Sequence, residues 1–338
     1  MDSEQWRRAG YARRHSLIKV LAVVPERASE GLARALGRGV ELSVGDDAAT
    51  IARAAPGAEV ILYSALAGGT PPFSEVWPHT GAGLRWVHSF EAGVDKLLTP
   101  ELRASDVTVT NAAGIYAPPL AEFAVLGVLF FYKRVRRLLR AQTQEKWDQH
   151  EVEALRGKVL GVAGYGGVGR ACAEACRKLG MRVWAVRRHP ERRERGVEQT
   201  FGPGQLHQML GGCDVLLAAA PLTPETHHML DAAAFAAMKA GGLVINVGRG
   251  PVIDEAALVA ALRSGQVAGA ALDVFEREPL AAGHPFWKME NVLLSPHCTD
   301  RTLDPYWIEV GMACFRDNFW RYRAGKPLRN VVDKAAGY

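Results

Sequence analysis

The sequence predicts an α/β fold of two domains, each built on a doubly wound parallel sheet. Its 338 residues are enough for two domains of ordinary size. From Arg156 onward, short apolar runs alternate with amphipathic helical patterns, which is typical of successive strand–helix–strand units. Similar apolar runs precede this region at a spacing that fits a second unit of the same kind. We therefore expect one parallel sheet in each half of the chain.

The elements follow from these runs in chain order. A long helix from about Pro119 to Trp147 is expected to join the halves, and the helical pattern after His297 is expected to pack back on the first domain. The predicted domains are residues 1–119 with 299–338, and residues 120–298. The predicted strands are residues 18–24, 60–63, 84–89 and 107–110 in the first domain, and 159–163, 183–186, 215–219, 243–247, 268–274 and 292–295 in the second.

The composition excludes several classes of partner. Apolar residues make up 48% and charged residues 23%, as in a globular protein. A formal charge of +5 is too small at this length to indicate nucleic-acid binding, but it suits anionic small molecules. The longest apolar run, residues 120–132, contains Glu122 and is too short for a membrane span. We expect neither a nucleic acid nor a membrane as partner.

The cysteines and the N-terminus indicate a reducing compartment. An odd number of cysteines, five, argues against a disulfide framework, and Cys172 and Cys176 fit a helical core. Residues 7–14 include arginines, but they are not followed by the apolar h-region of a secretory signal, so we expect a cytoplasmic protein, with organelle targeting left open. No metal site is expected, because His227 and His228 have no carboxylate or cysteine at ligand spacing.

A glycine-rich run, Gly164 to Gly169, has the pattern G-x-G-x-x-G between a predicted strand and a predicted helix. Glycines at these positions allow a tight turn and close approach of the backbone to a pyrophosphate at the helix N-terminus. The run predicts a Rossmann-type dinucleotide-binding domain, and a plain glycine-rich turn is the alternative. The candidate cofactor-binding residues here are Tyr165, Gly166, Gly167 and Val168.

Arg187 and Arg188 end the next predicted strand, where an acidic residue would bind the ribose 2′-hydroxyl of NAD(H). A carboxylate would repel a 2′-phosphate, whereas a guanidinium binds one through two hydrogen bonds. The pair predicts a preference for NADP(H), with NAD(H) possible. Two solvated surface arginines are the alternative.

Three further polar residues follow the ends of later predicted strands: Arg249, Glu278 and His297. Ligands of open α/β sheets lie beyond the carboxyl ends of the strands, so these residues form a candidate catalytic group beside the dinucleotide site. Each one alone could be structural.

Three ordered segments are distinctive: NVGRGPVID at residues 246–254, LDVFEREP at residues 272–279 and SPH at residues 295–297. With these motifs the sequence resembles the D-isomer-specific 2-hydroxyacid dehydrogenases. The resemblance is strongest from Leu84 to Thr302. The resemblance implies that His297 is the general acid/base, that Glu278 orients it and that Arg249 holds the substrate carboxylate and carbonyl oxygen.

The resemblance also implies roles for residues outside this group. The backbone of Ala92, Gly93 and Val94 would bind the other carboxylate oxygen, although the preceding Phe90 and Glu91 depart from the small residues common in the family. Cys298 is expected to be a small packing residue. The remaining implied cofactor contacts are Pro221, Thr223 and Thr226, then Val247, Gly248, Arg249 and Asp273, with Asp273 facing the nicotinamide amide.

The resemblance thus predicts a Rossmann-type coenzyme domain and a flavodoxin-like substrate domain. The expected function is NADP(H)-preferring reduction of a small 2-oxo acid, of the glyoxylate or hydroxypyruvate type. A dinucleotide-sensing, corepressor-like binding protein on the same fold is the alternative. Trp147 is similar to a family tryptophan that reaches a neighbouring subunit, which implies a homodimer; core packing is its alternative role.

Overall fold

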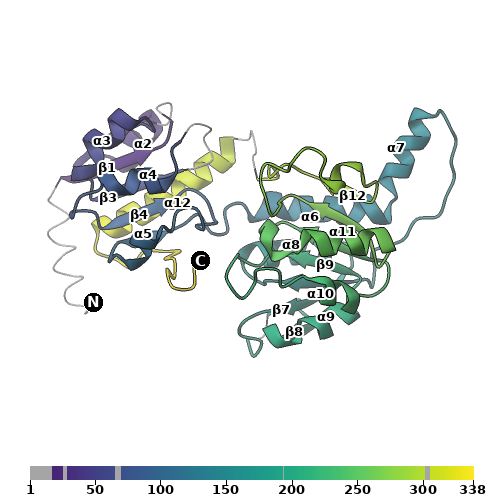
Figure 1. Ribbon diagram of the computed structural model, residues 1–338. Coiled ribbons are helices and arrows are strands. Elements are labelled where there is room, and N and C mark those ends of the chain that lie inside the picture. The colour runs from purple at the N-terminus through teal and green to yellow at the C-terminus, as the bar shows by residue number, and fades with distance from the viewer. Residues whose placement is uncertain (1–16, 26–28, 65–69, 193, 301–304) are drawn as a thin grey trace. The chain divides into compact units, whose positions relative to one another are not determined.

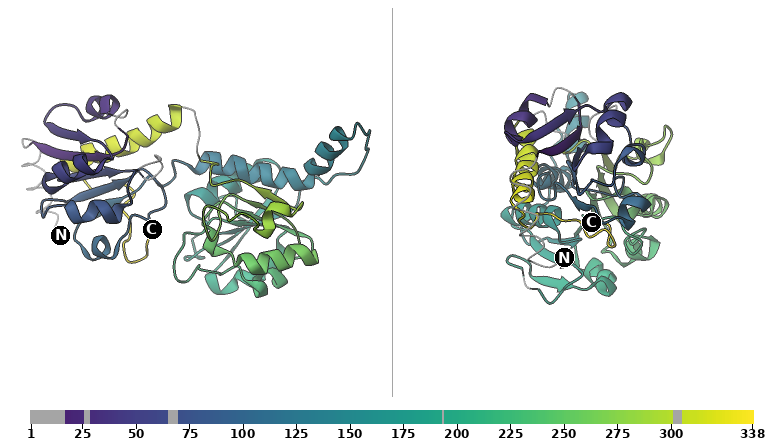
Figure 2. Two further views of the ribbon diagram at one scale, coloured as in Figure 1. Left: turned by 45° about the horizontal axis from the view of Figure 1, so that its top comes forward. Right: turned by 90° about the vertical axis from the view of Figure 1, so that its left-hand side faces the viewer.

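The computed structural model describes residues 17–25, 29–64, 70–192, 194–300 and 305–338. The chain divides into two compact units, Met1–Ile115 with Leu303–Tyr338 and Tyr116–Thr302. In Figures 1 and 2 each unit is a twisted sheet with helices packed on it. The N-terminal arginines considered for targeting lie outside the described residues.

The first unit is a flavodoxin-like doubly wound domain. Its elements are β1 (Ile18–Val23), α2 (Ser29–Leu36), β2 (Val40–Val44), α3 (Ala48–Ala54), β3 (Val60–Tyr63), α4 (Phe73–Val76), β4 (Trp86–Ser89), α5 (Pro100–Ala104), β5 (Thr108–Thr110) and α12 (Pro305–Arg323). The strands are parallel in the order β2-β1-β3-β4-β5. Alternate residues face α3, α4 and α5 on one side, and α2 and α12 on the other. Trp86 stacks on Phe315 at 5.4 Å between ring centroids, so the C-terminal helix belongs to this sheet's core.

The second unit is a Rossmann-type domain. Its elements are α6 (Ala117–Tyr132), α7 (Val135–Thr143), β6 (Val159–Ala163), α8 (Gly167–Lys178), β7 (Arg182–Val186), β8 (Gln199–Phe201), α9 (Leu206–Gly212), β9 (Val215–Ala218), α10 (Ala232–Ala237), β10 (Gly242–Asn246), α11 (Glu255–Ser264), β11 (Val267–Leu272) and β12 (Val292–Leu294). The strands are parallel in the order β12-β11-β10-β9-β6-β7-β8, so the order reverses beside β6. Helices α6 and α8 cover one face, and α9, α10 and α11 cover the other. Cys172 and Cys176 are buried, as predicted.

Three sequence predictions need correction. Strands β2 and β8 were not predicted, because both lie at sheet edges and carry few buried apolar residues. The single helix predicted from Pro119 to Trp147 is two helices, since Arg134 adopts a left-handed conformation with φ of 52° that ends α6. Trp147 lies beyond α7 and is 88% exposed, so it does not pack in the core.

The parallel arrangement decides where polar side chains gather in the second unit. Strands β6, β9, β10, β11 and β12 are consecutive neighbours in the sheet, and all end at the same edge. The loops that follow them therefore lie side by side. Among the helices that the structure describes, none combines the length and apolar character that a bilayer span requires.

Candidate active site

The glycine-rich run joins the end of β6 to the start of α8. Gly164 has a φ of +96°, and a Cβ added there would lie 2.4 Å from the Ala220 nitrogen. A Cβ on Gly169 would lie 2.2 Å from the carbonyl oxygen of Gly164. Both positions therefore require glycine, the first for the turn and the last for close packing of the helix on the strand.

Gly166 differs from these two glycines, because, apart from its immediate chain neighbours, no described residue has an atom within 4 Å of the position that its Cβ would take. Gly166 and Gly167 are exposed at the N-terminus of α8, while Tyr165 and Val168 pack into the core beside that helix. Free N–H groups and the helix dipole attract an anion to such a position. The open space above this helix N-terminus fits the pyrophosphate of a dinucleotide.

Arg187 lies at the end of β7 and is held by a carboxylate that the sequence did not reveal. Its Nη1 donates to Glu194 Oε1 at 3.1 Å and to the Arg192 carbonyl at 3.2 Å. Arg170, from the first turns of α8, donates to the same Glu194 oxygen at 3.0 Å. The Arg187 side chain is only 14% exposed, so it is not a solvated surface arginine. Arg188 beside it is exposed.

The loop after β9 contains Pro221, Thr223 and Thr226. Thr226 Oγ1 donates to the Pro221 carbonyl at 2.6 Å and accepts from the Thr223 N–H at 2.8 Å. These bonds close the loop into a compact turn. Because β9 is the direct neighbour of β6, this turn lies next to the glycine-rich run.

Arg249 follows β10 in a loop held by a buried amide. The Asn246 side chain accepts from the Gly248 N–H at 3.0 Å and donates to the Arg249 carbonyl at 3.2 Å. The Arg249 Nη1 donates to the Gly248 carbonyl at 3.0 Å. Val247 is buried, and its N–H bonds to the Ala218 carbonyl of β9. Hydrogen bonds therefore fix the backbone of the loop that carries the Arg249 side chain.

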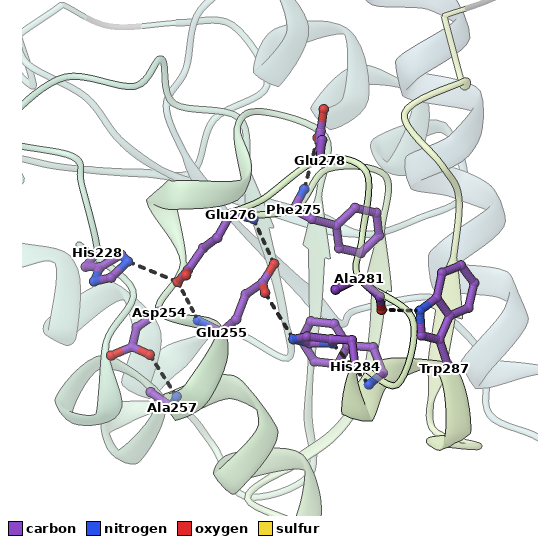
Figure 3. Close-up of polar contacts among 11 residues, drawn as sticks. His228, Asp254, Glu255, Ala257, Phe275, Glu276, Glu278, Ala281, His284 and Trp287 are labelled. Atoms are coloured by element: carbon purple, nitrogen blue, oxygen red, sulfur yellow. Dashed lines mark hydrogen bonds and ion pairs between the residues drawn. The ribbon is translucent and has the colours of Figure 1, made fainter.

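His297 and Glu278 come together from the loops after β12 and β11. The His297 Nδ1 lies 2.7 Å from Glu278 Oε2, and Glu278 Oε1 accepts from the Phe275 N–H at 3.1 Å. Figure 3 shows Glu278 above Phe275 at this turn. The two carboxylate oxygens thus have separate tasks, one holding the turn and the other meeting the imidazole.

The hydrogen bond to Glu278 raises the pKa of His297 above its ordinary value, and burial opposes the shift. The charges of Glu278 and Asp273 also raise this pKa, while that of Arg249 lowers it. All three predicted catalytic residues therefore lie within electrostatic range of one another. With Nδ1 directed at Glu278, Nε2 is the ring atom left to exchange a proton with a ligand.

Asp273 has a structural surrounding that the sequence did not reveal. It is buried, with one oxygen accepting from Ser295 Oγ at 2.6 Å and from the Cys298 N–H at 3.1 Å. Its other oxygen accepts from Thr299 Oγ1 at 2.6 Å. Asp273 therefore holds both sides of the loop that carries His297. Cys298 itself is exposed, so its predicted packing role was wrong.

The predicted substrate loop, Ala92 to Val94, follows β4 in the first unit. Asn111 Nδ2 donates to the Ala92 carbonyl at 2.6 Å, which fixes the loop to the neighbouring strand end. The Glu91 carboxylate accepts from Ser64 Oγ at 2.9 Å and Ser89 Oγ at 3.1 Å. The unusual glutamate is thus held by two serines at the ends of β3 and β4.

The two histidines considered for metal binding stack on each other, at 4.1 Å between ring centroids. His228 Nε2 lies 3.0 Å from Glu276 Oε1. Within the described residues no group of three or more side chains is arranged to hold a metal ion.

The sequence is similar to known proteins over most of its length. Residues 125–299 match the family model described as D-isomer specific 2-hydroxyacid dehydrogenase, NAD binding domain. The chain is 33% identical over 265 residues to a glyoxylate reductase from Aeropyrum pernix, with 74% of this chain and 77% of that protein covered.

Two solved structures extend the likeness to the whole fold. One is a D-isomer specific 2-hydroxyacid dehydrogenase from Xanthobacter autotrophicus in complex with NADPH and MES, 31% identical, with a TM-score of 0.81 and 96% of this chain and 100% of that chain covered. The other is an NADPH-dependent glyoxylate/hydroxypyruvate reductase from Sinorhizobium meliloti in complex with NADP and sulfate, 28% identical, with a TM-score of 0.79 and the same coverage.

Fold, site and comparisons together define an oxidoreductase of 2-hydroxy acids that binds a nicotinamide dinucleotide. The chain belongs to the D-isomer-specific 2-hydroxyacid dehydrogenase family.

Proposed function

We propose that the protein is an NADP(H)-preferring reductase of small 2-oxo acids, of the glyoxylate or hydroxypyruvate type. The observation that carries the proposal is the 2.7 Å contact between His297 Nδ1 and Glu278 Oε2. It provides a proton donor whose pKa is raised, so the imidazole keeps its proton toward higher pH. The names of the relatives from Aeropyrum and Sinorhizobium support the substrate class.

The chemistry requires a hydride, a proton and a hold on the substrate carboxylate. When bound, the nicotinamide coenzyme supplies the hydride to C2 of the oxo acid. His297 Nε2 gives its proton to the C2 oxygen as the alkoxide develops, and Glu278 stabilises the imidazolium before transfer. Arg249 holds the substrate carboxylate and the carbonyl oxygen through its planar fork, and the N–H groups of the Ala92–Val94 loop are proposed as further contacts to the substrate carboxylate.

The coenzyme is assigned to the carboxyl edge of the second sheet. The N–H groups around Gly166 and Gly167 would hold the pyrophosphate. Further contacts are proposed for Tyr165, Val168, Pro221, Thr223, Thr226, Val247, Gly248, Arg249 and Asp273. Arg187 and Arg188, with Arg170 close to Arg187 through Glu194, support NADP(H) over NAD(H), because guanidinium groups favour a 2′-phosphate.

A homodimer is proposed from the region around α7. This helix has no buried residue along its length, all of which the structure describes, and Figure 1 shows it projecting from the sheet of its unit. Leu138 is 47% exposed, Leu139 55% and Trp147 88%. Apolar side chains gathered on such an extension are typical of an interface, so we propose that a second copy covers them and that Trp147 contacts its partner.

A cytoplasmic location is also proposed. Burial raises the pKa of Cys172, Cys176 and Cys213 to about 12, so these thiols remain protonated and unreactive. They suit a reducing compartment, where core cysteines need no protection from oxidation.

The test is loss of NADPH absorbance with a panel of 2-oxo acids that includes glyoxylate, hydroxypyruvate, pyruvate and 2-oxoglutarate. We expect turnover with the two small acids and a lower kcat/KM with NADH. Coenzyme binding without turnover of any panel member would contradict the proposal and favour the dinucleotide-sensing binding protein instead.

A further inference from the structure

Two glutamates form a reciprocal contact beneath the turn that carries Glu278. The Glu255 N–H donates to Glu276 Oε1 at 2.9 Å, and the Glu276 N–H donates to Glu255 Oε1 at 2.8 Å. Glu255 is the first residue of α11, and Glu276 follows β11 (Figure 3). Each carboxylate therefore binds the other residue's backbone, and the start of α11 is tied to the turn after β11.

Histidines on both sides complete this clasp, which we define as Glu255, Glu276, His228 and His284. His284 Nδ1 accepts from the Phe286 N–H at 3.3 Å, so Nε2 carries the hydrogen. His284 Nε2 lies 3.3 Å from Glu255 Oε2, which leaves Glu255 Oε1 for the backbone of Glu276. His228 Nε2 lies 3.0 Å from Glu276 Oε1.

The inner carboxylate of the clasp is the more enclosed one. The Glu255 side chain is 13% exposed, whereas that of Glu276 is 33% exposed. Burial raises the pKa of Glu255, and its hydrogen bond from the Glu276 backbone opposes the shift. A half-buried carboxylate is costly unless its oxygens are bonded, so the contacts of Glu255 are specific ones.

The peptide between Phe275 and Glu276 connects the clasp to the catalytic pair. Its N–H side is fixed by Glu255, and its other surface lies against Gly250, where an added Cβ would come within 1.9 Å of the Phe275 oxygen. The Phe275 N–H, one residue earlier, donates to Glu278 Oε1. The direction of that N–H therefore decides where Glu278 Oε2 meets His297.

We propose that Glu255 is a positioning residue for the proton donor, acting through the Phe275–Glu276 peptide and Glu278 on His297. The inference rests on the proposed function in taking the Glu278–His297 pair as the proton donor. Without the Glu255 acceptor, the Glu276 N–H is unsatisfied and the turn can rotate. Glu278 then holds the imidazole less tightly, and protonated His297 loses part of its stabilisation.

The pKa of His297 reports this geometry directly. Among the residues that the structure describes, the charged groups acting on the imidazole are Glu278 and Asp273, which raise the pKa, and Arg249, which lowers it. Because Glu255 acts on the turn and not on the ring, its removal should lower the His297 pKa by weakening the contact with Glu278. Lost stability elsewhere in the fold would leave this pKa unchanged.

The experiment follows the His297 imidazole by NMR titration of histidine-labelled full-length protein, with His297→Gln used to assign the signal. Glu255→Met fills a similar volume without an acceptor, and Glu255→Gln keeps an oxygen for the Glu276 N–H. Both remove the same charge, so their difference isolates the hydrogen bond. Glu101→Ala is the control, because Glu101 is also a first-turn acid but belongs to α5 in the other unit.

We expect Glu255→Met to lower the His297 pKa by about half a unit and kcat about tenfold, with the KM for oxo acid and the Kd for NADPH within twofold of wild type. Glu255→Gln should show less than half of each effect, and Glu101→Ala none. Thermal unfolding checks that each variant is folded; if the Met variant is not, Glu255→Ala takes its place.

The outcomes separate the inference from the proposed function. Glu278→Gln should lower the His297 pKa more than any Glu255 variant does. If Glu278→Gln shifts the pKa but Glu255→Met leaves it unchanged, the positioning role is wrong and the proton donor pair stands. If Glu278→Gln itself has no effect, the pair on which the proposed function depends is absent. Equal shifts in the Met and Gln variants would assign the effect to charge and overturn the proposal.

Discussion

The Glu278 carboxylate contacts His297 at 2.7 Å across nineteen residues of sequence, and both side chains follow strands that are direct neighbours in the sheet. The pair consists of a proton-carrying ring and a carboxylate that favours its charged form. One oxygen of the carboxylate is already used by the Phe275 N–H, so the other has a fixed direction. This arrangement leads to the first two predictions.

Replacing His297 with Gln should lower kcat for oxo acid reduction by about 10²–10⁴-fold, the usual contribution of a positioned proton donor. The affinity for NADPH, measured by quenching of protein fluorescence, should stay within twofold of wild type, because the imidazole is assigned no coenzyme contact. Near-wild-type turnover in this variant would remove His297 from its proposed role.

The pH dependence should follow the raised pKa of His297. Reduction needs the protonated imidazole, so kcat should be constant at low pH and fall as pH rises through a pKa above the ordinary histidine value. Glu278→Gln removes the largest cause of the shift, so the fall should move to lower pH. The measurement is kcat with saturating NADPH across about pH 5 to 10, a range that contains the ordinary imidazole pKa of about 6.5 and extends further above it than below. A profile that Glu278→Gln leaves unmoved would contradict the assignment.

Arg249→Lys should reduce activity more than conservation of charge suggests. An ammonium cannot reproduce the two parallel hydrogen bonds that a guanidinium makes to a carboxylate. We expect a loss in kcat/KM equivalent to about 1.5–3 kcal/mol, the usual size of a charged hydrogen bond. Equal kcat/KM for the lysine variant and wild type on every acid of the panel would place the carboxylate hold elsewhere.

Arg187→Ala should shift the coenzyme preference toward NADH. Loss of a charge-assisted contact to the 2′-phosphate should lower the ratio of kcat/KM for NADPH over NADH by about 10- to 150-fold. Arg182→Ala is a matched control, because Arg182 lies at the start of the same strand, at the end opposite to Arg187, and pairs there with Glu198. Both ratios are measured at one ionic strength, since salt screens such contacts. A ratio unchanged in Arg187→Ala, or lowered equally in the control, would dismiss the assignment.

His88 should make the first unit sensitive to acid. Burial lowers the pKa of His88 to about 3, and the unfolded chain would titrate near 6.5. The unfolded state therefore binds the extra proton between these values, so stability is full above about pH 6.5 and falls as pH drops toward 3. From pH 7 to pH 5 this group should cost about 2 kcal/mol of unfolding free energy.

The check is urea unfolding of wild type and His88→Gln at pH 7 and pH 5. The variant should lose less stability than wild type over this interval, because its side chain does not titrate. The His88 Nδ1 lies 2.6 Å from Thr110 Oγ1, which holds the ring in place. The same Thr110 oxygen accepts a hydrogen bond from Trp86 Nε1. Parallel losses in the two proteins would show that His88 is not the group responsible.

The sequence predicted the central strands well because their apolar runs are continuous and end in glycine or polar residues. Gly164 and Gly169 could be assigned roles because the spacing of the glycines reports the shape of the turn. The edge strand β2 was missed because its apolar residues alternate with polar ones instead of forming a continuous run, and none of them is fully buried. Arg134 gave no signal for the end of α6, since a left-handed arginine is uncommon and depends on its surroundings.

The sequence predicted those residues of the candidate site that lie in recognisable motifs. His297, Glu278 and Arg249 follow strand ends in recognisable segments. Glu194 and Glu255 were missed because a glutamate in a loop or a first helical turn usually faces solvent. Their partners, Arg170 and Glu276, lie 24 and 21 residues away in sequence, and only the folded sheet brings them into contact. The contact between Ser295 and Asp273 had only a weak signal in the sequence, namely a hydroxyl side chain two residues before His297.

Gly250 has a consequence for how this protein can vary over generations. Every other amino acid begins its side chain with the carbon that would collide with the Phe275–Glu276 peptide. Substitution of Gly250 is therefore not tolerated in this backbone conformation. The backbone of the loop that carries Arg249 can change only if the turn that carries Glu278 changes with it. New substrate preferences should therefore arise from mutations in other parts of the chain, while the loop of Arg249 and the turn of Glu278 stay unchanged together.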